Sequence, residues 1–151
     1  MTTTTQTEIR PAGLEDMTVC VNMIQQLRQE TFWKHMEGQD YPEVMSILLV
    51  HRLLTNPNVC LYVAEQEGKI VGLCGGEIDS HFLAPHVPLL REWAWWVVPE
   101  HRMGSIGARL WLTVLSWAKT RGVRYGLRTR VLSSEKRGKE LGEESFTVKE
   151  L

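Results

Sequence analysis

One strand followed by one helix constrains the fold more than any other feature. Residues 90–98 (LREWAWWVV) have the composition of a strand, and their second half is apolar on both faces. That pattern is typical of a central strand covered on both sides. A turn at residues 99–104 leads into a helical pattern at residues 105–121, with Ile106, Leu110, Val114 and Trp117 on one stripe. The chain is therefore expected to be an α/β domain.

The remaining elements follow from changes of hydrophobic period and from turn residues. Helices are expected from Glu15 onward and at residues 42–54, where Val44, Ile47, Leu48 and Leu54 form the apolar set. A loop is expected at residues 79–88, and a short helix at 133–142. Strands are expected at residues 9–12, 59–65, 70–78, 123–132 and 146–151. The predicted order is β-α-α-β-β-β-α-β-α-β.

Composition narrows the class of protein. The 17 basic and 18 acidic residues nearly balance, so the net charge of -1 gives no support to a nucleic-acid or membrane partner. Basic residues gather between Arg121 and Lys139, either as a solvated face or as a nucleic-acid site. The three cysteines contain no Cys-x-x-Cys pair, which suits reduced thiols in the cytoplasm. Residues 1–7 are expected to be a disordered tail, without the features of a signal peptide, and 8–151 a single domain.

The turn before the long helix has a sequence suited to binding an anion. The first N–H groups of a helix lack internal partners, and the helix dipole adds partial positive charge there. Small residues at Gly104, Ser105 and Gly107 would let a phosphate approach these amides, with Arg102 adding a cation. The alternative is a turn in which Gly107 only allows close packing of the helix on the sheet. Composition does not separate the two interpretations.

The segment from Val97 to Ala108 (VVPEHRMGSIGA) resembles the acyl-CoA signature of the GNAT (GCN5-related N-acetyltransferase) superfamily, Gln/Arg-x-x-Gly-x-Gly/Ala after Val-x-Pro-Glu. Arg102 fills the first position and Gly107 the last, whereas Ser105 stands where a glycine is usual. The opening at residues 9–16 and the Gly68–Gly72 hairpin are also similar to the family pattern. The resemblance spans residues 8–151 and is strongest at 97–110. It implies a mixed, mostly antiparallel sheet of about six to seven strands, with a central V-shaped splay and about four helices.

The resemblance also implies an activity and a co-substrate. An acetyl group would pass directly from acetyl-CoA to a primary amine of a small molecule or peptide, in a ternary complex and without a metal. A non-catalytic module that binds CoA or a protein partner is the alternative. A homodimer is compatible with the family. The residues expected to hold acetyl-CoA are Trp96, Val97, Val98, Arg102, Met103, Gly104, Ser105, Ile106, Gly107, Ala108 and Ser134.

Glu92 is the expected general base, because many family members carry a glutamate on this strand that acts through water. Burial beside apolar groups would raise its pKa towards neutrality. Alternation along a regular strand puts Trp96 on the same face as Glu92, with Trp93 and Trp95 on the other. A strand-edge or substrate-cation partner is the other interpretation of Glu92. Many family members have a tyrosine that acts as the general acid for the leaving thiolate. Gly138 stands at that position in this chain, so the group that protonates the thiolate is unassigned.

The resemblance implies that the acceptor is bound by the segment after the first helix and by the loop before residues 90–98. Trp33 and Tyr41, with Glu37 and Asp40, would form an aromatic and acidic rim suited to a cationic amine. Glu77 and Asp79 end one strand and would attract the same charge. His81 and His86 would bind substrate or relay a proton, or would simply be exposed loop histidines; their spacing does not indicate a metal.

Overall fold

A computed structural model of the chain describes residues 6–30, 43–131 and 144–151. Six strands form one sheet in the order β1-β2-β3-β4-β5-β6, and every neighbouring pair is antiparallel except β4 and β5. Three α-helices are described beside them. The expected α/β class, with a mixed and mostly antiparallel sheet, is confirmed. The short helix expected at residues 133–142 lies outside the described residues.

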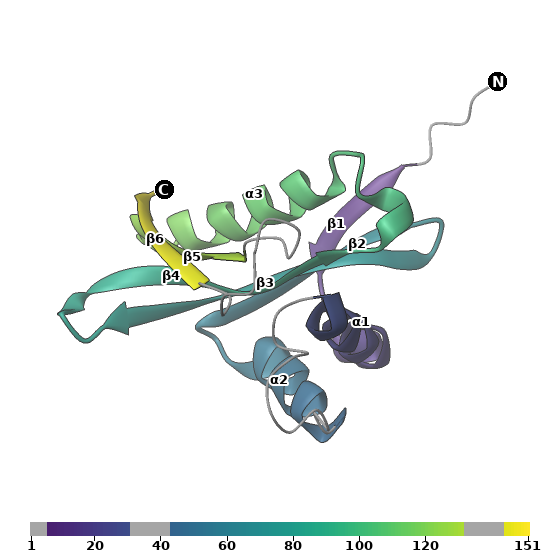
Figure 1. Cartoon of the computed structure of the whole chain (residues 1–151), viewed down its shortest axis with the longest axis horizontal. Helices are drawn as coiled ribbons and strands as arrows, with labels where there is room; N and C mark the ends of the chain where they lie inside the picture. Colours follow the sequence, from purple (N-terminus) through teal and green to yellow (C-terminus); the bar gives the residue numbers. More distant parts are fainter. Residues whose placement is uncertain (1–5, 31–42, 132–143) are drawn as a thin grey trace, which may run out of the picture.

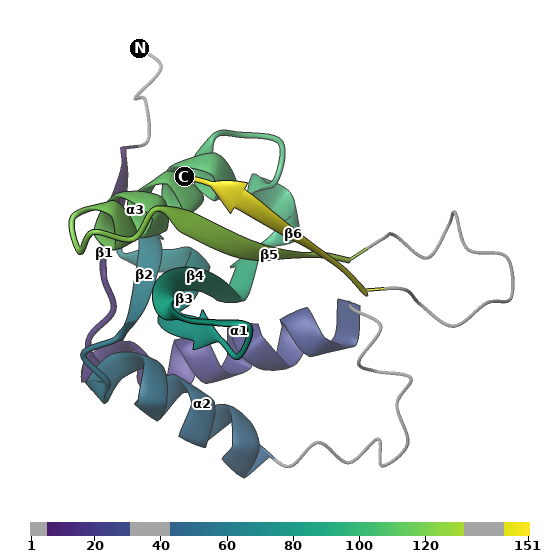
Figure 2. The same ribbon diagram turned by 90° about the vertical axis from the view of Figure 1, so that its left-hand side faces the viewer.

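The elements follow the predicted order. The strands are β1 (Thr7–Pro11), β2 (Val59–Gln66), β3 (Lys69–His81), β4 (Ala84–Val97), β5 (Tyr125–Val131) and β6 (Glu144–Glu150). The helices are α1 (Met17–Glu30), α2 (Glu43–Thr55) and α3 (Ile106–Lys119), with short 3-10 turns η1 (Leu14–Asp16) and η3 (Pro99–His101). Figures 1 and 2 show α3 on one face of the sheet and α1 with α2 on the other.

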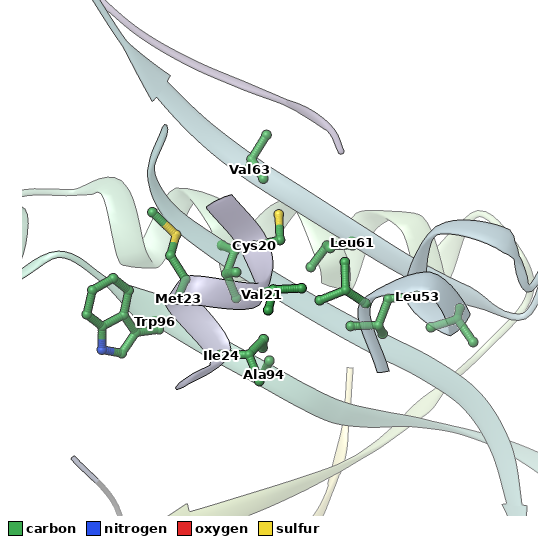
Figure 3. Close-up of a cluster of buried hydrophobic side chains, with 12 residues drawn as sticks. Cys20, Val21, Met23, Ile24, Leu53, Leu61, Val63, Ala94 and Trp96 are labelled. Atoms are coloured by element: carbon green, nitrogen blue, oxygen red, sulfur yellow. The ribbon is translucent and has the colours of Figure 1, made fainter. Parts of the chain in front are cut away.

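The core is split in two by the sheet. On the α1 and α2 side, Cys20, Ile24 and Val50 pack with Leu73 and Trp96 in one buried cluster (Figure 3). On the α3 side, the expected stripe of Ile106, Leu110, Val114 and Trp117 is buried against residues of the sheet that include Leu90 and Val97. β4 contributes to both clusters, as expected for a strand covered on both faces.

Three of the four apolar residues noted in the sequence of α2 do not face the core. Its buried residues are Ser46, Val50 and Leu53, whereas Val44, Ile47 and Leu48 are exposed. The reason is that α2 is apolar nearly all round, so its sequence carries little information about which side faces the sheet.

The prediction of a loop at residues 79–88 is wrong. β3 continues to His81 and β4 starts at Ala84, so this segment forms the end of a long hairpin that extends beyond the helices (Figure 1). Pro85 and Pro88 argued for a loop. They are tolerated because β5 pairs with β4 only from Leu89 onward, which leaves the start of β4 an edge strand.

Two turns match their sequence signals. The β2–β3 hairpin turns at Glu67 and Gly68, which both have positive φ angles (51° and 73°), as a tight two-residue hairpin requires. Gly122, with φ 78°, follows the end of α3, and the next N–H, of Val123, donates to the carbonyl of Ala118 at 3.2 Å. Both glycines stand where an L side chain would be strained.

Candidate functional site

The site is built on a separation between β4 and β5. β3 pairs with β4 along most of its length, as far as Val97, but β5 pairs only with Leu89, Leu90 and Arg91. From Glu92 to Val97, no other strand of the described chain pairs with that side of β4. We call this stretch the open edge of β4. It is the central splay that the family resemblance implied.

The direction of one peptide group shows which backbone groups of β4 face the open edge. The N–H of Val98 donates to Val71 on β3 at 2.9 Å, so the carbonyl of Val97, on the other side of the same peptide bond, points away from β3. Successive residues of a strand direct their backbone groups to opposite edges. The backbone groups of Val97 and Trp95 therefore face the open edge, whereas those of Trp96 face β3.

The chain leaves β4 through η3 and starts α3 close to the open edge. Ser105 is the residue before the helix, and no side chain caps its first amides among the described residues. The turn residues Met103, Gly104 and Ser105 are exposed, whereas Ile106 is buried and anchors the helix. Helix-start amides beside exposed small residues fit a phosphate group.

Neither small residue in this turn is required by an unusual backbone angle. Ser105 has φ -88° and ψ -1°, which serine adopts without strain, so the missing family glycine has no conformational cost. A Cβ added at Gly104 would have its nearest neighbour, the carbonyl oxygen of His101, 3.8 Å away. The protein itself leaves the space beside Gly104 open, which is what an approaching phosphate needs.

Gly107 has closer neighbours. A Cβ there would lie 3.6 Å from Nε1 of Trp95 and 3.7 Å from Cγ2 of Val97. The Trp95 indole N–H also donates to the Gly107 carbonyl at 3.1 Å. Gly107 thus joins the start of α3 to the strand next to the exposed turn, at ordinary contact distances that do not themselves require a glycine.

Arg102 is held within the protein. Its Nε donates to the Val97 carbonyl at 2.7 Å, its Nη2 pairs with Glu30 at 2.6 Å, and its guanidinium lies 5.5 Å from the Trp96 ring centre. These contacts tie the turn to the end of α1. They also place a cation at the open edge of β4, with much of its charge balanced by Glu30.

Glu92 lies beside a bulge in β4. Glu92 pairs with Gly76 and Ala94 with Gly75, so Trp93 is an extra residue in the strand. A Cβ on Gly76 would meet Val114 of α3, and one on Gly75 would meet Leu53 of α2. Their partners share these faces, which puts Glu92 on the α3 face.

The predicted grouping of side chains on β4 is wrong because of this bulge. Trp96 packs in the cluster of α1 and α2 (Figure 3), opposite Glu92, and Trp95 packs on the α3 side with Glu92. Only Trp93 lies opposite Glu92 as expected, against the α1 and α2 cluster. One carboxylate oxygen of Glu92, Oε2, is withdrawn from solvent.

Glu77 has two partners inside the protein. Its Oε1 is paired with Arg52 of α2, and its Oε2 accepts a hydrogen bond of 2.6 Å from the indole of Trp93. Glu77 is 8% exposed. Its negative charge is therefore already balanced, and this arrangement lends no support to the prediction that it attracts an amine.

The hairpin histidines lie away from the open edge. His81 is at the end of β3, where its ring lies tilted against that of Phe82, 4.5 Å between centres, and its Nδ1 accepts a hydrogen bond from the Leu83 N–H at 3.2 Å. Asp79 pairs with Arg91 at 3.2 Å. His86 is exposed near the start of β4, and His101 lies in η3. Trp33, Tyr41 and Ser134, and the positions of Glu37, Asp40 and Gly138, lie outside the described residues.

The cysteines do not provide a nucleophile. Cys20, Cys60 and Cys74 are buried thiols that form no disulfide bond. Burial raises the pKa of Cys20 to about 12 and that of Cys60 to about 11, which keeps both protonated at neutral pH. Among the residues that the structure describes, no group of three metal-ligating side chains occurs, and no helix is long and apolar enough to cross a membrane.

Three solved structures illustrate the likeness in fold. PaiA N-acetyltransferase from Thermoplasma acidophilum, in complex with coenzyme A, is 14% identical, with coverage of 97% of this chain and 99% of that one and a TM-score of 0.71. A predicted acetyltransferase from Clostridium acetobutylicum with acetyl-CoA is 17% identical, with coverages of 87% and 84% and a TM-score of 0.69. Aminoglycoside N-acetyltransferase AAC(6')-Iy with CoA is 17% identical, with coverages of 82% and 76% and a TM-score of 0.67.

Sequence comparison with curated proteins gives no significant match. The family model described as the acetyltransferase (GNAT) family, however, matches residues 22–138, which is most of the chain and includes the open edge, the turn and α3. The chain belongs to the GNAT family of acetyltransferases.

Proposed function

We propose that the protein transfers an acetyl group directly from acetyl-CoA to a primary amine, with both substrates bound together. The observation that carries this proposal is the adjacency of the open edge of β4 and the start of α3. An extended arm with amide groups can pair with the first, and a pyrophosphate can be held by the second. Acetyl-CoA carries both groups, and residues 8–151 would form one domain around them.

The arm of acetyl-CoA would run along β4 at Trp95 and Val97, whose backbone groups face the open edge. The carbonyl of Val97 already accepts a hydrogen bond from Arg102, so its N–H is the group left for the arm. Of the three residues predicted on this strand, Val97 is the one that the backbone direction favours. The N–H of Val98 pairs with β3 instead.

The pyrophosphate would be held by backbone amides between Met103 and Ala108. Three features support this: the helix start at Ile106, the exposed residues Gly104 and Ser105, and the open space beside Gly104. Arg102 would contribute mainly by fixing the turn, since Glu30 balances its charge. Ser134 remains a proposed contact.

Glu92 would serve as the general base that removes a proton from the attacking amine, directly or through water. It sits where β4 leaves β5, on the α3 face, and part of its carboxylate is shielded from solvent. A direct attack needs no covalent enzyme intermediate, which agrees with the protonated state of the buried thiols. The amine nitrogen takes the acetyl group, and coenzyme A leaves as the thiol.

The acceptor is proposed to be a cationic amine. AAC(6')-Iy has been solved with a bisubstrate analogue, CoA-S-monomethyl-acetylneamine, at 17% identity. Aminoglycosides therefore belong in the panel to be tested, beside small amines and peptides. Trp33, Tyr41 and His81 remain proposed acceptor residues, and a homodimer in the cytoplasm remains the proposed setting.

Turnover tests this proposal. We expect release of coenzyme A from acetyl-CoA with at least one class of amine, and we expect Glu92→Gln to lower kcat about a hundredfold or more. Glu8→Gln, the same chemical change at an exposed position of β1, is the matched control and should leave kcat within about twofold. Transfer that survives Glu92→Gln unchanged would remove Glu92 as the base. No transfer to any amine would favour a module that only binds CoA.

A further inference from the structure

The bulge in β4 is held by side chains from three elements. We infer that Arg52 of α2, Glu77 of β3 and Trp93 of β4 form a clamp that fixes the bulge and thereby positions Glu92 and the open edge. We call these three residues the bulge clamp. They are positioning residues, because they act through the strand. This role rests on the proposed function only where it concerns Glu92.

The contacts of the clamp are mutual. Trp93 donates its indole N–H to Glu77 at 2.6 Å, Arg52 pairs with the other carboxylate oxygen, and the Arg52 guanidinium lies 5.1 Å from the Trp93 ring centre. Each residue thus contacts the other two. Glu77 is 8% exposed, so its hydrogen bonds form where water competes weakly.

β3 provides little else to fix the register at this point. The residues opposite the bulge are Gly75 and Gly76, which have no side chains to pack against a neighbour. Strands rich in glycine are prone to slip in register. The space for larger residues is missing as well, because a Cβ on Gly76 would lie 2.9 Å from Leu90 and 3.1 Å from Val114. The clamp supplies a side-chain constraint where β3 has none.

The register matters because Trp93 is the extra residue. With Trp93 held towards α2, Glu92 faces α3, and Trp95 and Val97 turn their backbone groups to the open edge. If the bulge were lost and regular pairing continued from Gly75 and Ala94, Glu92 would lie opposite Glu77 and its side chain would turn to the other face of the sheet. The clamp therefore decides on which side of the sheet the proposed base lies.

The chain offers a matched control for removing the clamp's hydrogen bond. Trp93→Phe keeps an aromatic ring beneath Arg52 but deletes the indole N–H. Trp117, on α3, also carries an arginine over its ring, Arg121 at 4.6 Å, and is 8% exposed. Trp117→Phe makes the same chemical change away from the bulge and reports any general loss of stability.

Cross-strand contacts in the nuclear Overhauser spectrum test the clamp without any substrate. In Trp93→Phe we expect the contacts Gly76–Glu92 and Gly75–Ala94 to weaken or to split into two sets, while Leu73–Trp96 persists. In Trp117→Phe all three should persist. If Trp93→Phe leaves the Gly76–Glu92 and Gly75–Ala94 contacts as sharp and single as in the wild type, the clamp does not hold the bulge.

A double-mutant cycle tests the link to Glu92. As a single substitution, Trp93→Phe should lower kcat about tenfold or more, because misplacing a reacting group slows the chemical step. In a Glu92→Gln background the same change should lower kcat by less than about twofold, since the group being positioned is already lost. An equal loss in both backgrounds would show that Trp93 does not act through Glu92. If the wild type acetylates no amine, the proposed function fails, and the spectra still decide the clamp.

Discussion

Asp16 gives the clearest prediction about stability, because it ties the first strand to the first helix. It is 6% exposed and accepts two hydrogen bonds from Arg10, at 2.7 and 3.0 Å, and one from the Gly13 N–H at 2.8 Å. Arg10 also binds Glu65, whose side chain is 30% exposed. Asp16→Asn keeps the size of the side chain but removes its charge.

The expected cost of Asp16→Asn is about 2 kcal/mol of unfolding free energy, since hydrogen bonds to charged groups contribute about 1.5–3 kcal/mol and Arg10 is partly solvated. For a chain of this size, that corresponds to a fall of about 4–8 °C in Tm. Glu65→Gln is the matched control. It removes an exposed partner of the same arginine and should cost about 1 kcal/mol or less.

The loss of unfolding free energy in Asp16→Asn should depend on pH. The hydrogen bonds from Arg10 hold the pKa of Asp16 below its ordinary value of 3.8. The folded state therefore favours the charged form, and this stabilisation is present above the unfolded-state pKa and is lost as pH falls through the folded pKa. Urea unfolding of both variants between pH 7 and pH 3 measures it. A gap between wild type and Asp16→Asn that stays constant over this range, or an equal cost for Glu65→Gln, would refute the reasoning.

Two further predictions concern the core. Leu110→Ala should lower the unfolding free energy by about 2–5 kcal/mol in urea titrations, because Leu110 is fully buried between α3 and the sheet and the surroundings would close the cavity only in part; a cost below about 1 kcal/mol would contradict that packing. Cys20 and Cys60 should react with Ellman's reagent only as the protein unfolds, because burial raises the pKa of their thiols to about 12 and about 11; rapid reaction of the native protein at pH 8 would contradict their burial.

The sequence predicted the elements on which the site stands. The apolar run of β4, the turn, and the stripe from Ile106 to Trp117 were all readable because they repeat with the period of a strand or a helix. The glycine at 122 marked the end of α3 for a conformational reason that the structure confirms. The α/β class and the place of the turn were therefore accessible from periodicity and turn chemistry, whereas the mixed sheet and its splay were expected only from the family resemblance.

What the sequence missed depends on contacts between distant residues. Nothing local distinguishes a bulge at Trp93 from a regular strand, yet the bulge reverses the faces of Trp95 and Trp96 relative to Glu92. The partners of Glu77 come from α2 and β4, so a lone glutamate at a strand end suggested a substrate contact. Two adjacent glycines at 75 and 76 were the one available sign of an irregular strand.

Binding of coenzyme A measured by calorimetry tests the central claim most directly. We expect the wild type to bind both acetyl-CoA and coenzyme A, and Gly104→Leu to weaken both at least about tenfold, because the new side chain would occupy the space left for the phosphates. Lys69→Leu, an exposed change in the β2–β3 hairpin, should bind as the wild type does. No heat of binding for the wild type at millimolar acetyl-CoA, or unchanged binding by a folded Gly104→Leu, would contradict the assignment of this turn as the pyrophosphate site.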